Sequence, residues 1–240
     1  MSTGFLGIKS SIATIEEYKI LRANIIFSIP SCTCKIIGIT SAEAYTGKST
    51  TSLNLALTFA QTKARVLLID CDLRKPRLAN LVGRASTLGI SNLLVNINSL
   101  EEVLQHVDDN LDMIFSGDIP PNPSELLGSD RMRDILDELS ENYDYIFIDT
   151  PPVIVSDTVV LSKYLTGTVL VVRAGLSKRD YVMSAIEQLK FAGANLLGFV
   201  LNDSEAGSSK RTGGKNNKYY GYGRYKKNSH SHSKSLQKKA

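Results

Sequence analysis

Cysteine and long apolar runs are both scarce in this chain of 240 residues. Its three cysteines, Cys32, Cys34 and Cys71, are too few and wrongly spaced for a disulfide framework or a zinc site, so we expect reduced thiols. No apolar run approaches the roughly 20 residues needed to cross a bilayer, and Met1 to Ser10 contains no signal-peptide core. These absences predict a soluble, intracellular protein.

Acidic residues are missing from the end of the chain. Residues 207–240 contain ten Lys or Arg and no Asp or Glu, which leaves 18 basic residues against all 24 acidic ones in residues 1–206. The net charge is therefore about −6 for the body and about +10 for the tail. Because the tail also lacks Val and Ile, it cannot bury enough apolar surface to fold alone. We predict a folded domain over residues 1–206 and a disordered basic tail over 207–240.

A phosphate-binding pattern dominates what is present. Residues 41–50, SAEAYTGKST, lie between an apolar run and a stretch with helical apolar spacing. In a loop of the form G-x-x-x-x-G-K-[ST], backbone N–H groups and the helix N-terminus surround phosphates, the Lys reaches the β and γ phosphates, and Ser or Thr binds Mg²⁺. The sequence therefore predicts a nucleotide contact at each of Thr46, Gly47, Lys48, Ser49 and Thr50.

The pattern departs from this form in two places. Ala42 stands where the first Gly is expected, and bulky Tyr45 lies inside the loop, where a side chain restricts the approach of the backbone to phosphate. A Gly-Lys-Ser tripeptide also caps ordinary helices, so the loop alone leaves a structural interpretation open. Other stretches of the chain are needed to decide between the two.

Two apolar runs that end in acids supply this evidence. The first covers 65–70, with Asp72 just beyond Asp70, and the second covers 145–149 and ends at Asp149. Ends of buried parallel strands line the ligand crevice of open α/β sheets. One acid of the first pair can hold Mg²⁺ while the other accepts a proton from an attacking hydroxyl, and Asp149 can order the Mg²⁺ shell. Simple capping is the alternative for each acid.

Alternating apolar runs and helical patterns extend along the rest of the body. They predict an α/β fold of the P-loop NTPase type, with one parallel sheet of five or six strands and helices on both faces. The prolines of 117–127 predict a rigid connection into a helix. No Asn-Lys-x-Asp element selects guanine, which favours adenine, and Asn202 follows the last apolar run, where it could reach the base.

Residues 14–28 predict an amphipathic helix. Glu16, Lys19 and Arg22 recur on one face, apart from the apolar residues. A solvated charged face is one interpretation, and a self-association surface is the other.

Four tyrosines lie close together in the basic tail: Tyr219, Tyr220, Tyr222 and Tyr225. No core is predicted there for them to pack against, so they are candidate phosphate acceptors. Aromatic contacts with RNA or lipid are the alternative.

Taken together, these stretches resemble the bacterial tyrosine kinases of capsular and extracellular polysaccharide synthesis, in the form whose transmembrane activator is a separate polypeptide. The resemblance covers nearly the whole chain. It rests on the following segments in this order: Gly47 to Thr50, Asp70 to Pro76, Pro120 to Leu127, Ile148 to Pro152, and Tyr219 to Tyr225.

The resemblance implies roles for individual residues. In the family, the residues matching Lys48 and Ser49 bind phosphates and Mg²⁺, and the Asp matching Asp70 is the proposed base. The residues matching Asp72 and Asp149 arrange the metal. A Glu-x-x-Arg-x-x-Arg pattern implicated in ring-shaped self-association occurs here as Glu16, Lys19 and Arg22; Lys keeps the charge but loses the bidentate geometry of Arg.

The resemblance also implies cofactors and partners. These are ATP and Mg²⁺, a transmembrane activator acting through its cytoplasmic segment, a ring-shaped homo-oligomer and a cognate tyrosine phosphatase, with no specific nucleic acid. The expected location is the cytoplasm, at the inner face of the cell membrane through the activator. The expected activity is tyrosine phosphorylation of the chain's own tail, which regulates polysaccharide synthesis and export.

Two other functions stay open at this point. A membrane- or DNA-positioning ATPase of the partitioning type would carry an additional Lys early in the loop, where this chain has Glu43. A non-catalytic adaptor that has lost nucleotide binding is suggested only by Tyr45, and the intact Asp70, Asp72 and Asp149 argue against it.

Overall fold

The structure is a computed structural model that describes residues 12–29, 34–85 and 87–204. The predicted boundary at 206/207, the tail and its four tyrosines lie outside the described residues, as does Cys32. Among the described residues, no helix combines the length and apolar character needed to cross a membrane.

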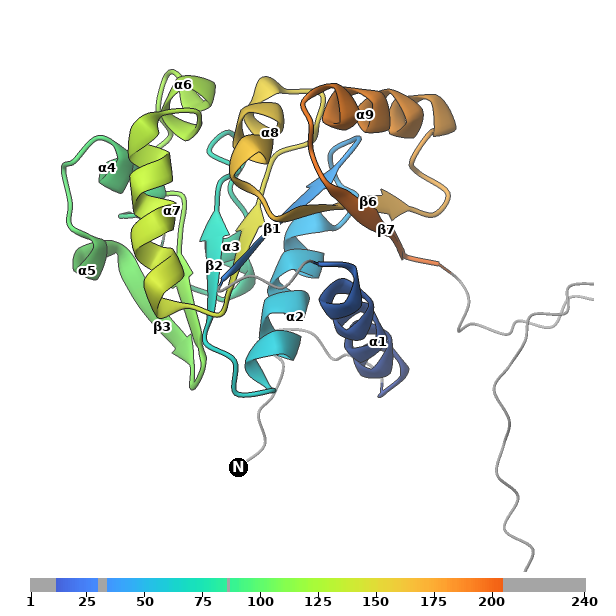
Figure 1. Cartoon of the computed structure of the whole chain (residues 1–240), viewed down its shortest axis with the longest axis horizontal. Helices are drawn as coiled ribbons and strands as arrows, with labels where there is room; N and C mark the ends of the chain where they lie inside the picture. Colours follow the sequence, from blue (N-terminus) through green and yellow to red (C-terminus); the bar gives the residue numbers. More distant parts are fainter. Residues whose placement is uncertain (1–11, 30–33, 86, 205–240) are drawn as a thin grey trace, which may run out of the picture. The chain divides into compact units, whose positions relative to one another are not determined.

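One seven-stranded sheet forms the centre of the domain, in the order β3-β4-β2-β5-β1-β6-β7 (Figure 1). Every neighbouring pair is parallel except β3 with β4, which is antiparallel. The strands are β1 (Lys35–Ser41), β2 (Val66–Asp70), β3 (Leu104–Asp108), β4 (Leu111–Ile114), β5 (Tyr145–Asp149), β6 (Gly167–Arg173) and β7 (Leu196–Asn202).

Helices cover both faces of the sheet (Figure 1), as predicted. Helices α1, α2 and α3 pack on one face, and α4, α6, α7, α8 and α9 pack on the other. The helices are α1 (Ile12–Ser28), α2 (Lys48–Ala60), α3 (Leu78–Leu81), α4 (Ile90–Leu94), α5 (Leu100–Val103), α6 (Pro123–Leu127), α7 (Asp130–Asn142), α8 (Ser156–Leu161), a 3₁₀ turn η1 (Ser162–Tyr164) and α9 (Arg179–Phe191).

The expectation of an all-parallel sheet of five or six strands is wrong at one edge. Strand β3 runs antiparallel to β4, is only partly buried, and follows directly on the short helix α5. An edge strand that is half exposed has no continuous apolar run, so its residues do not stand out in the sequence. Antiparallel edge strands of this kind are common on otherwise parallel sheets.

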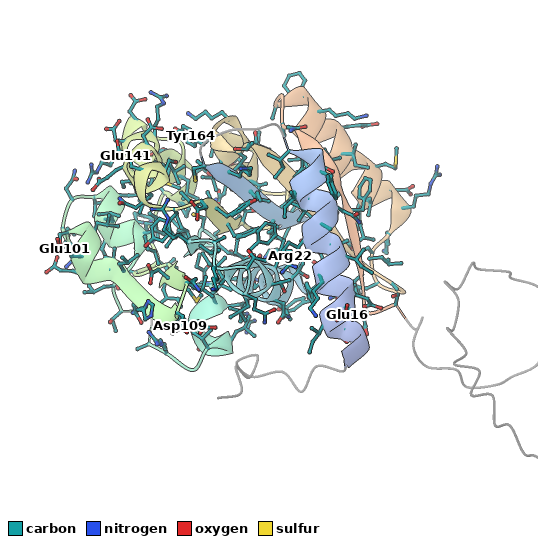
Figure 2. All side chains as sticks on the ribbon, turned by 60° about the horizontal axis from the view of Figure 1, so that its bottom comes forward. Glu16, Arg22, Glu101, Asp109, Glu141 and Tyr164 are labelled. Atoms are coloured by element: carbon teal, nitrogen blue, oxygen red, sulfur yellow. The ribbon has the colours of Figure 1, made fainter. Side chains whose placement is uncertain are left out.

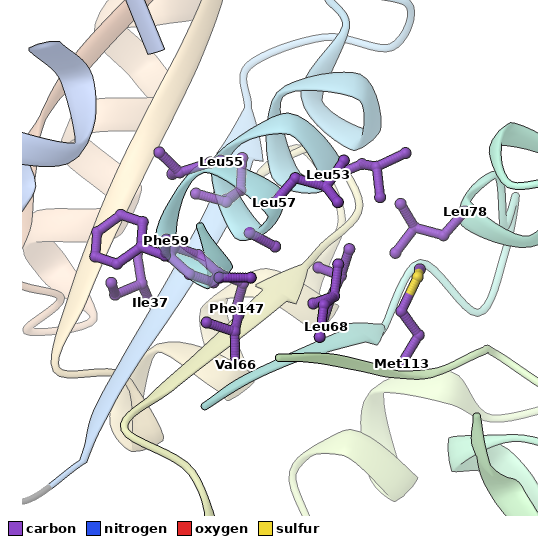
Figure 3. Packing of buried hydrophobic residues seen from close by; sticks show 14 of the residues in the cluster. Ile37, Leu53, Leu55, Leu57, Phe59, Val66, Leu68, Leu78, Met113 and Phe147 are labelled. Carbon is purple, nitrogen blue, oxygen red and sulfur yellow. The ribbon is translucent and has the colours of Figure 1, made fainter. Parts of the chain in front are cut away.

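The core explains why the central strands are apolar along their whole length. In β2, Val66 and Leu68 face the α2 layer, whereas Leu67 and Ile69 face the α7 layer, and all four are fully buried. Figure 3 shows the first of these layers, where Phe59 of α2 lies against the sheet. Its ring centroid is 5.1 Å from that of Phe147 on β5.

Helix α1 is held to α2 by one of its predicted self-association residues. Arg22, labelled in Figure 2, is part of α1. It donates a hydrogen bond from Nη1 to the carbonyl oxygen of Thr58, one of the last four carbonyls of α2. A cation at this end of a helix also complements the helix dipole. Lys19 and Glu16 pair with each other at 2.7 Å on the exposed side of α1. Two of these three residues thus remain at the surface, and Arg22 is used within the chain.

Candidate functional site

The phosphate-binding loop connects β1 to α2, as predicted. Gly47 precedes the first residue of α2 with φ of +92°, a left-handed conformation that strains any residue with a Cβ atom. A Cβ atom at Gly47 would also lie 2.1 Å from Nδ2 of Asn202. Lys48 and Ser49 begin α2, so their backbone N–H groups belong to the free N-terminus of a 13-residue helix.

Two side chains from the ends of β6 and β7 hold this loop in place. Asn202 at the end of β7 donates from Nδ2 to the carbonyl oxygen of Thr46 at 2.8 Å. Arg173 at the end of β6 donates to the carbonyl oxygen of Tyr45 at 3.0 Å and pairs with Asp203 at 2.9 Å. Tyr45 itself has φ of +63°, and its side chain is 71% exposed. The Tyr45 side chain is thus held at the surface, and it is one of the residues that line the pocket described below.

Asn202 makes a contact that the sequence pattern did not predict. It does not line the pocket described below, and its amide nitrogen supports the loop, while contact with a base stays a prediction. We expect Asn202→Ala to lower ATP affinity by up to about tenfold, since it removes one hydrogen bond worth ~0.5–1.5 kcal/mol from the loop. Titration with a fluorescent nucleotide measures this. Asn195→Ala is the control, because Asn195 makes an equivalent bond to Thr166, at 2.9 Å, on another loop. Equal affinities in the two variants would contradict the prediction.

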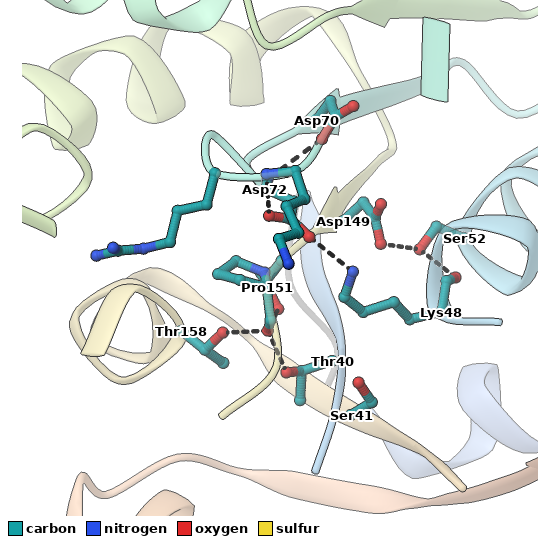
Figure 4. A network of polar contacts seen from close by, with 12 residues as sticks. Thr40, Ser41, Lys48, Ser52, Asp70, Asp72, Asp149, Pro151 and Thr158 are labelled. Atoms are coloured by element: carbon teal, nitrogen blue, oxygen red, sulfur yellow. Dashed lines mark hydrogen bonds and ion pairs between the residues drawn. The ribbon is translucent and has the colours of Figure 1, made fainter. Parts of the chain in front are cut away.

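The three predicted acids lie close together at the carboxyl ends of the central strands β2 and β5 (Figure 4). Strands β2 and β5 are neighbours in register, so Asp70 and Asp149 lie directly beside each other. Asp72 follows Asp70 and accepts a hydrogen bond from Lys48 Nζ at 2.8 Å. Asp70 is fully buried and accepts hydrogen bonds from the backbone N–H of Asp72 and of Leu78. The predicted catalytic set of Lys48 and three acids is thus brought together.

The arrangement around Asp149 fits a Mg²⁺ ion. Its Oδ1 accepts a hydrogen bond from Ser52 at 3.0 Å, whereas its Oδ2 is buried and accepts none from the described residues. The described residues contain no group of three His, Cys, Asp or Glu side chains placed to hold a metal by themselves. Mg²⁺ usually binds through one or two carboxylates together with water and substrate phosphates. Asp149 and Asp72 with the Ser49 hydroxyl suit that kind of site.

Burial and crowding change the proton affinity of these groups. Burial, with the charge of Asp149 beside it, raises the pKa of Asp70 to about 8. Burial likewise raises the pKa of Asp149 to about 6, although the Lys48 cation and the Ser52 hydroxyl oppose this. Burial alone would lower the pKa of Lys48, but the negative charges of Asp149 and Asp72 outweigh it and raise the pKa. At neutral pH the site therefore keeps the Lys48 cation and holds a proton on Asp70.

The raised pKa values of Asp70 and Asp149 predict that stabilisation of the protein by Mg²⁺ and nucleotide depends on pH. A carboxyl whose pKa is higher in the folded state binds more protons when folded, so its contribution to stability is lost as the pH rises from about 4 through the folded pKa, about 8 for Asp70. Mg²⁺ needs ionised carboxylates. We expect Mg²⁺ with ADP to raise the melting temperature by at least ~2 °C more at pH 8 than at pH 6. ADP with a chelator is the control, and an equal or smaller gain at pH 8 would contradict the prediction.

A pocket of about 470 Å³ opens over the phosphate loop, which is within the usual range for ligand sites. It is lined by Lys48, Ser49, Thr50 and Asp72, as the sequence predicts, and its wall continues onto the loop after β5. Fully buried Asp70 and Asp149 lie outside the lining, and Thr46 contributes its carbonyl to the support described above. Tyr45 and Gly47 of the loop line the pocket as well. The lining residues to which the sequence assigns no role are Ala44, Arg74, Lys75, Arg77, Asn80, Leu81, Pro151, Pro152, Ile154 and Val155.

Of these additional residues, some belong to stretches that the sequence already marks. Arg74, Lys75, Pro151 and Pro152 directly follow the acid-terminated strands, which is a usable signal for pocket residues. Pro151 is held by its carbonyl oxygen, which accepts hydrogen bonds from Thr40 at 2.9 Å and Thr158 at 2.7 Å (Figure 4). Nothing in the sequence pattern singles out Asn80 or Ile154, because their position depends on how the loops fold back.

Comparison with known proteins agrees with this geometry. Residues 34–190 match the family model described as AAA domain. The chain is 38% identical over 208 residues to the tyrosine-protein kinase YwqD of Bacillus subtilis, which covers 86% of each chain. It is 36% identical over 198 residues to the tyrosine-protein kinase CpsD of Streptococcus agalactiae, covering 81% of this chain and 86% of that one.

Solved structures give the same result. The kinase domain of the Escherichia coli tyrosine kinase ETK superposes with a TM-score of 0.80 at 34% identity, covering 88% of this chain and 85% of that chain. The chimerical protein CapA2B2 superposes with a TM-score of 0.75 at 37% identity over 80% of this chain and 85% of that chain. The septum site-determining protein MinD of Pyrococcus horikoshii, complexed with Mg-ADP, has a TM-score of 0.60 at 24% identity over 70% of each chain and shares the fold alone.

A phosphate-binding loop with its lysine facing three converging acids, and relatives that cover most of both chains, lead to one conclusion. The chain belongs to the family of bacterial tyrosine-protein kinases.

Proposed function

We propose that this protein transfers the γ-phosphoryl group of ATP to tyrosine hydroxyls of its own tail, at Tyr219, Tyr220, Tyr222 and Tyr225. The observation that carries the proposal is the placement of Lys48 Nζ 2.8 Å from Asp72, at the N-terminus of α2 and inside a pocket of nucleotide size. The tail begins after the last described strand, and 13 residues from the body to Tyr219 give a root-mean-square reach of roughly 20 Å. A neighbouring subunit in a closely packed oligomer lies within that reach.

The phosphoryl transfer forms one bond and breaks one bond. The bond from the tyrosine oxygen to the γ-phosphorus forms, the bond from that phosphorus to the β–γ bridging oxygen breaks, and ADP leaves with the electron pair. The phenol proton passes to a carboxylate. Most of the catalytic effect in this chemistry comes from positioning and charge neutralisation. Lys48 and the N–H groups at the start of α2 perform these tasks here, and Mg²⁺, when bound by Ser49, Asp72 and Asp149, neutralises phosphate charge.

Asp70 is the proposed proton acceptor. Its pKa, raised to about 8, makes its ionised form a stronger base than an ordinary carboxylate, and this ionised form is the one that can remove a phenol proton. Two backbone N–H groups orient it, from Asp72 and Leu78. The role requires the site to open above Asp70 when nucleotide and tyrosine bind, because the side chain is fully buried here.

The proposal extends to regulation of capsular or extracellular polysaccharide synthesis through a transmembrane activator. The name of the chimerical protein CapA2B2, which joins two components, supports a partner segment for this chain as well. A cognate tyrosine phosphatase would reverse the modification. We further propose a ring-shaped homo-oligomer in which exposed Glu16 and Lys19 face a neighbouring subunit and Arg22 keeps α1 in place on α2.

A positioning ATPase has weaker support. The likeness to MinD extends to the fold only. Glu43, at the position where partitioning ATPases carry an additional Lys, accepts a hydrogen bond from the backbone N–H of Lys178 at the start of α9, so it has a structural use in this loop.

The proposed function is tested by incubating the full chain with labelled ATP and Mg²⁺, with and without the activator's cytoplasmic segment, followed by mass spectrometry of the tail peptide. The expected result is phosphate on the tail tyrosines. Release of free phosphate with an unmodified tail would instead indicate an ATPase. Binding of ATP without turnover in the presence of the activator segment would indicate an adaptor.

A further inference from the structure

Arg74 is anchored beside the phosphate site by a network that joins three separate parts of the chain. Its Nε donates to Oδ2 of Asp157 at 2.8 Å, and its Nη2 donates to Oδ1 of the same carboxylate at 2.9 Å. The hydroxyl of Ser124 also donates a short hydrogen bond to Asp157. Arg74 follows the acids after β2, Asp157 lies in α8, and Ser124 lies in α6.

Burial of the Asp157 carboxylate costs free energy unless hydrogen bonds and an opposite charge compensate for the lost hydration. The Asp157 side chain is 0% exposed, and burial would raise its pKa, but the hydrogen bonds from Arg74 and Ser124 lower it below its usual value. Asp157 is therefore ionised at neutral pH, and a bidentate pair with Arg restricts the guanidinium to one orientation.

The rest of the guanidinium group is available to the pocket. The Arg74 side chain is 44% exposed and lines the pocket together with Lys48, Ser49 and Asp72. Among the described residues, no acceptor takes a hydrogen bond from its Nη1 atom. Lys75 and Arg77 also line the pocket, but the described residues include no acidic side chain paired with either. Of these three cations, Arg74 is the one that a described acidic side chain holds in a fixed orientation.

We propose that Arg74 contacts the γ-phosphoryl group during its transfer and that Asp157 and Ser124 are positioning residues that hold Arg74 for this contact. This rests on the proposed function and adds a second fixed cation, besides Lys48, to the charge that the site neutralises. It also gives a use to the proline-rich connection before α6, since Asn122 and Pro123 start the helix that carries Ser124. During the step, Arg74 remains protonated, and the bonds formed and broken are those of the transfer described above.

The first test is a binding measurement that needs no turnover. The affinities of a non-hydrolysable ATP analogue and of ADP, each with Mg²⁺, are compared by calorimetry in the full chain. In Arg74→Ala, the ratio of analogue to ADP affinity should fall about tenfold or more, as expected for a lost charge-assisted hydrogen bond, while ADP affinity changes less than about threefold. An unchanged ratio would overturn the proposal.

The matched control is a second Arg–Asp pair far from the pocket. Arg65 pairs with Asp144 at 2.9 Å, with a side chain 58% exposed, so Arg65→Ala removes the same chemistry at another place. Neither the affinity ratio nor tail phosphorylation should change in this variant. If both Arg→Ala variants lower the ratio equally, the effect is general destabilisation and the proposal fails.

The second test separates positioning from simple structural support. Millimolar guanidinium should restore part of the tail phosphorylation rate of Arg74→Ala, because Asp157 and Ser124 still form a receptor for the ion. It should not restore the rate of the double variant Arg74→Ala/Asp157→Asn. Rescue of both variants, or of neither, would contradict the positioning role. If the protein without substitutions releases free phosphate and its tail tyrosines carry no phosphate, the proposed function fails. The ratio of analogue to ADP affinity still reports on Arg74 in that case.

Discussion

Replacement of Lys48 by Met is expected to reduce tail phosphorylation by at least about a hundredfold. Lys48 provides the cation that faces Asp72 at 2.8 Å and that the phosphate chain of ATP would share. Loss of one preorganised donor from a site that stabilises developing charge commonly costs ~10²–10³ in rate. Mass spectrometry of the tail peptide after incubation with Mg²⁺ and ATP measures the effect.

The fold of this variant should remain, with lower stability in the absence of nucleotide. Without Lys48, the charges of Asp70, Asp72 and Asp149 repel one another with no cation between them, and the effect grows as the pH rises and the acids ionise. Lys190→Met, on the exposed side of α9, is the control for removal of a lysine. Tail phosphorylation at the unmodified rate in Lys48→Met would contradict the assigned role of this residue.

Of the substitutions proposed for this protein, Phe59→Ala should lower the free energy of unfolding the most. Phe59 is 1% exposed, and its ring packs between Tyr145 and Phe147, with centroid distances of 4.5 Å and 5.1 Å. Truncation of such a residue leaves a cavity and usually costs ~3–5 kcal/mol in the free energy of unfolding. Denaturant unfolding of the two variants Phe59→Ala and Phe191→Ala measures the difference.

Phe191 is a matched control because it is the same residue type with the opposite environment. It ends α9 and is 95% exposed, so its truncation should change the free energy of unfolding by no more than ~0.5 kcal/mol. A similar loss in both variants would mean that the packing of α2 on the sheet is less important than the structure indicates. Because α2 starts at the phosphate loop, Phe59→Ala should also weaken nucleotide binding at temperatures near its melting point.

The central part of the fold was predictable because its strands are buried on both faces. A run such as 145–149 has no polar interruption, ends in an acid and matches strand β5 residue for residue. The helix predicted at 14–28 likewise agrees with α1, which covers Ile12–Ser28. Strand β3 was not predictable, since a half-exposed edge strand such as 104–108 has a mixed pattern that also suits a loop.

The residues of the candidate site likewise divide into those that the sequence predicts and those that only the structure reveals. Lys48, Asp70, Asp72 and Asp149 were identified from sequence because each follows a recognisable strand or loop pattern, and parallel strands bring such ends to one edge of the sheet. The roles of Asn202, Arg173 and Asp157 depend on contacts across 156, 128 and 83 positions of the chain. No local pattern encodes contacts of that range.

The sequence by itself therefore determined the α/β class, the phosphate loop and the acids, because hydrophobic periodicity and short motifs are local properties. Only the tertiary structure decided how these parts are supported: Asn202 holds the loop, Arg22 is used within the chain, and Asp157 fixes the direction of Arg74. The physical reason is that a buried polar group must find its partner wherever the fold brings one, regardless of separation along the chain.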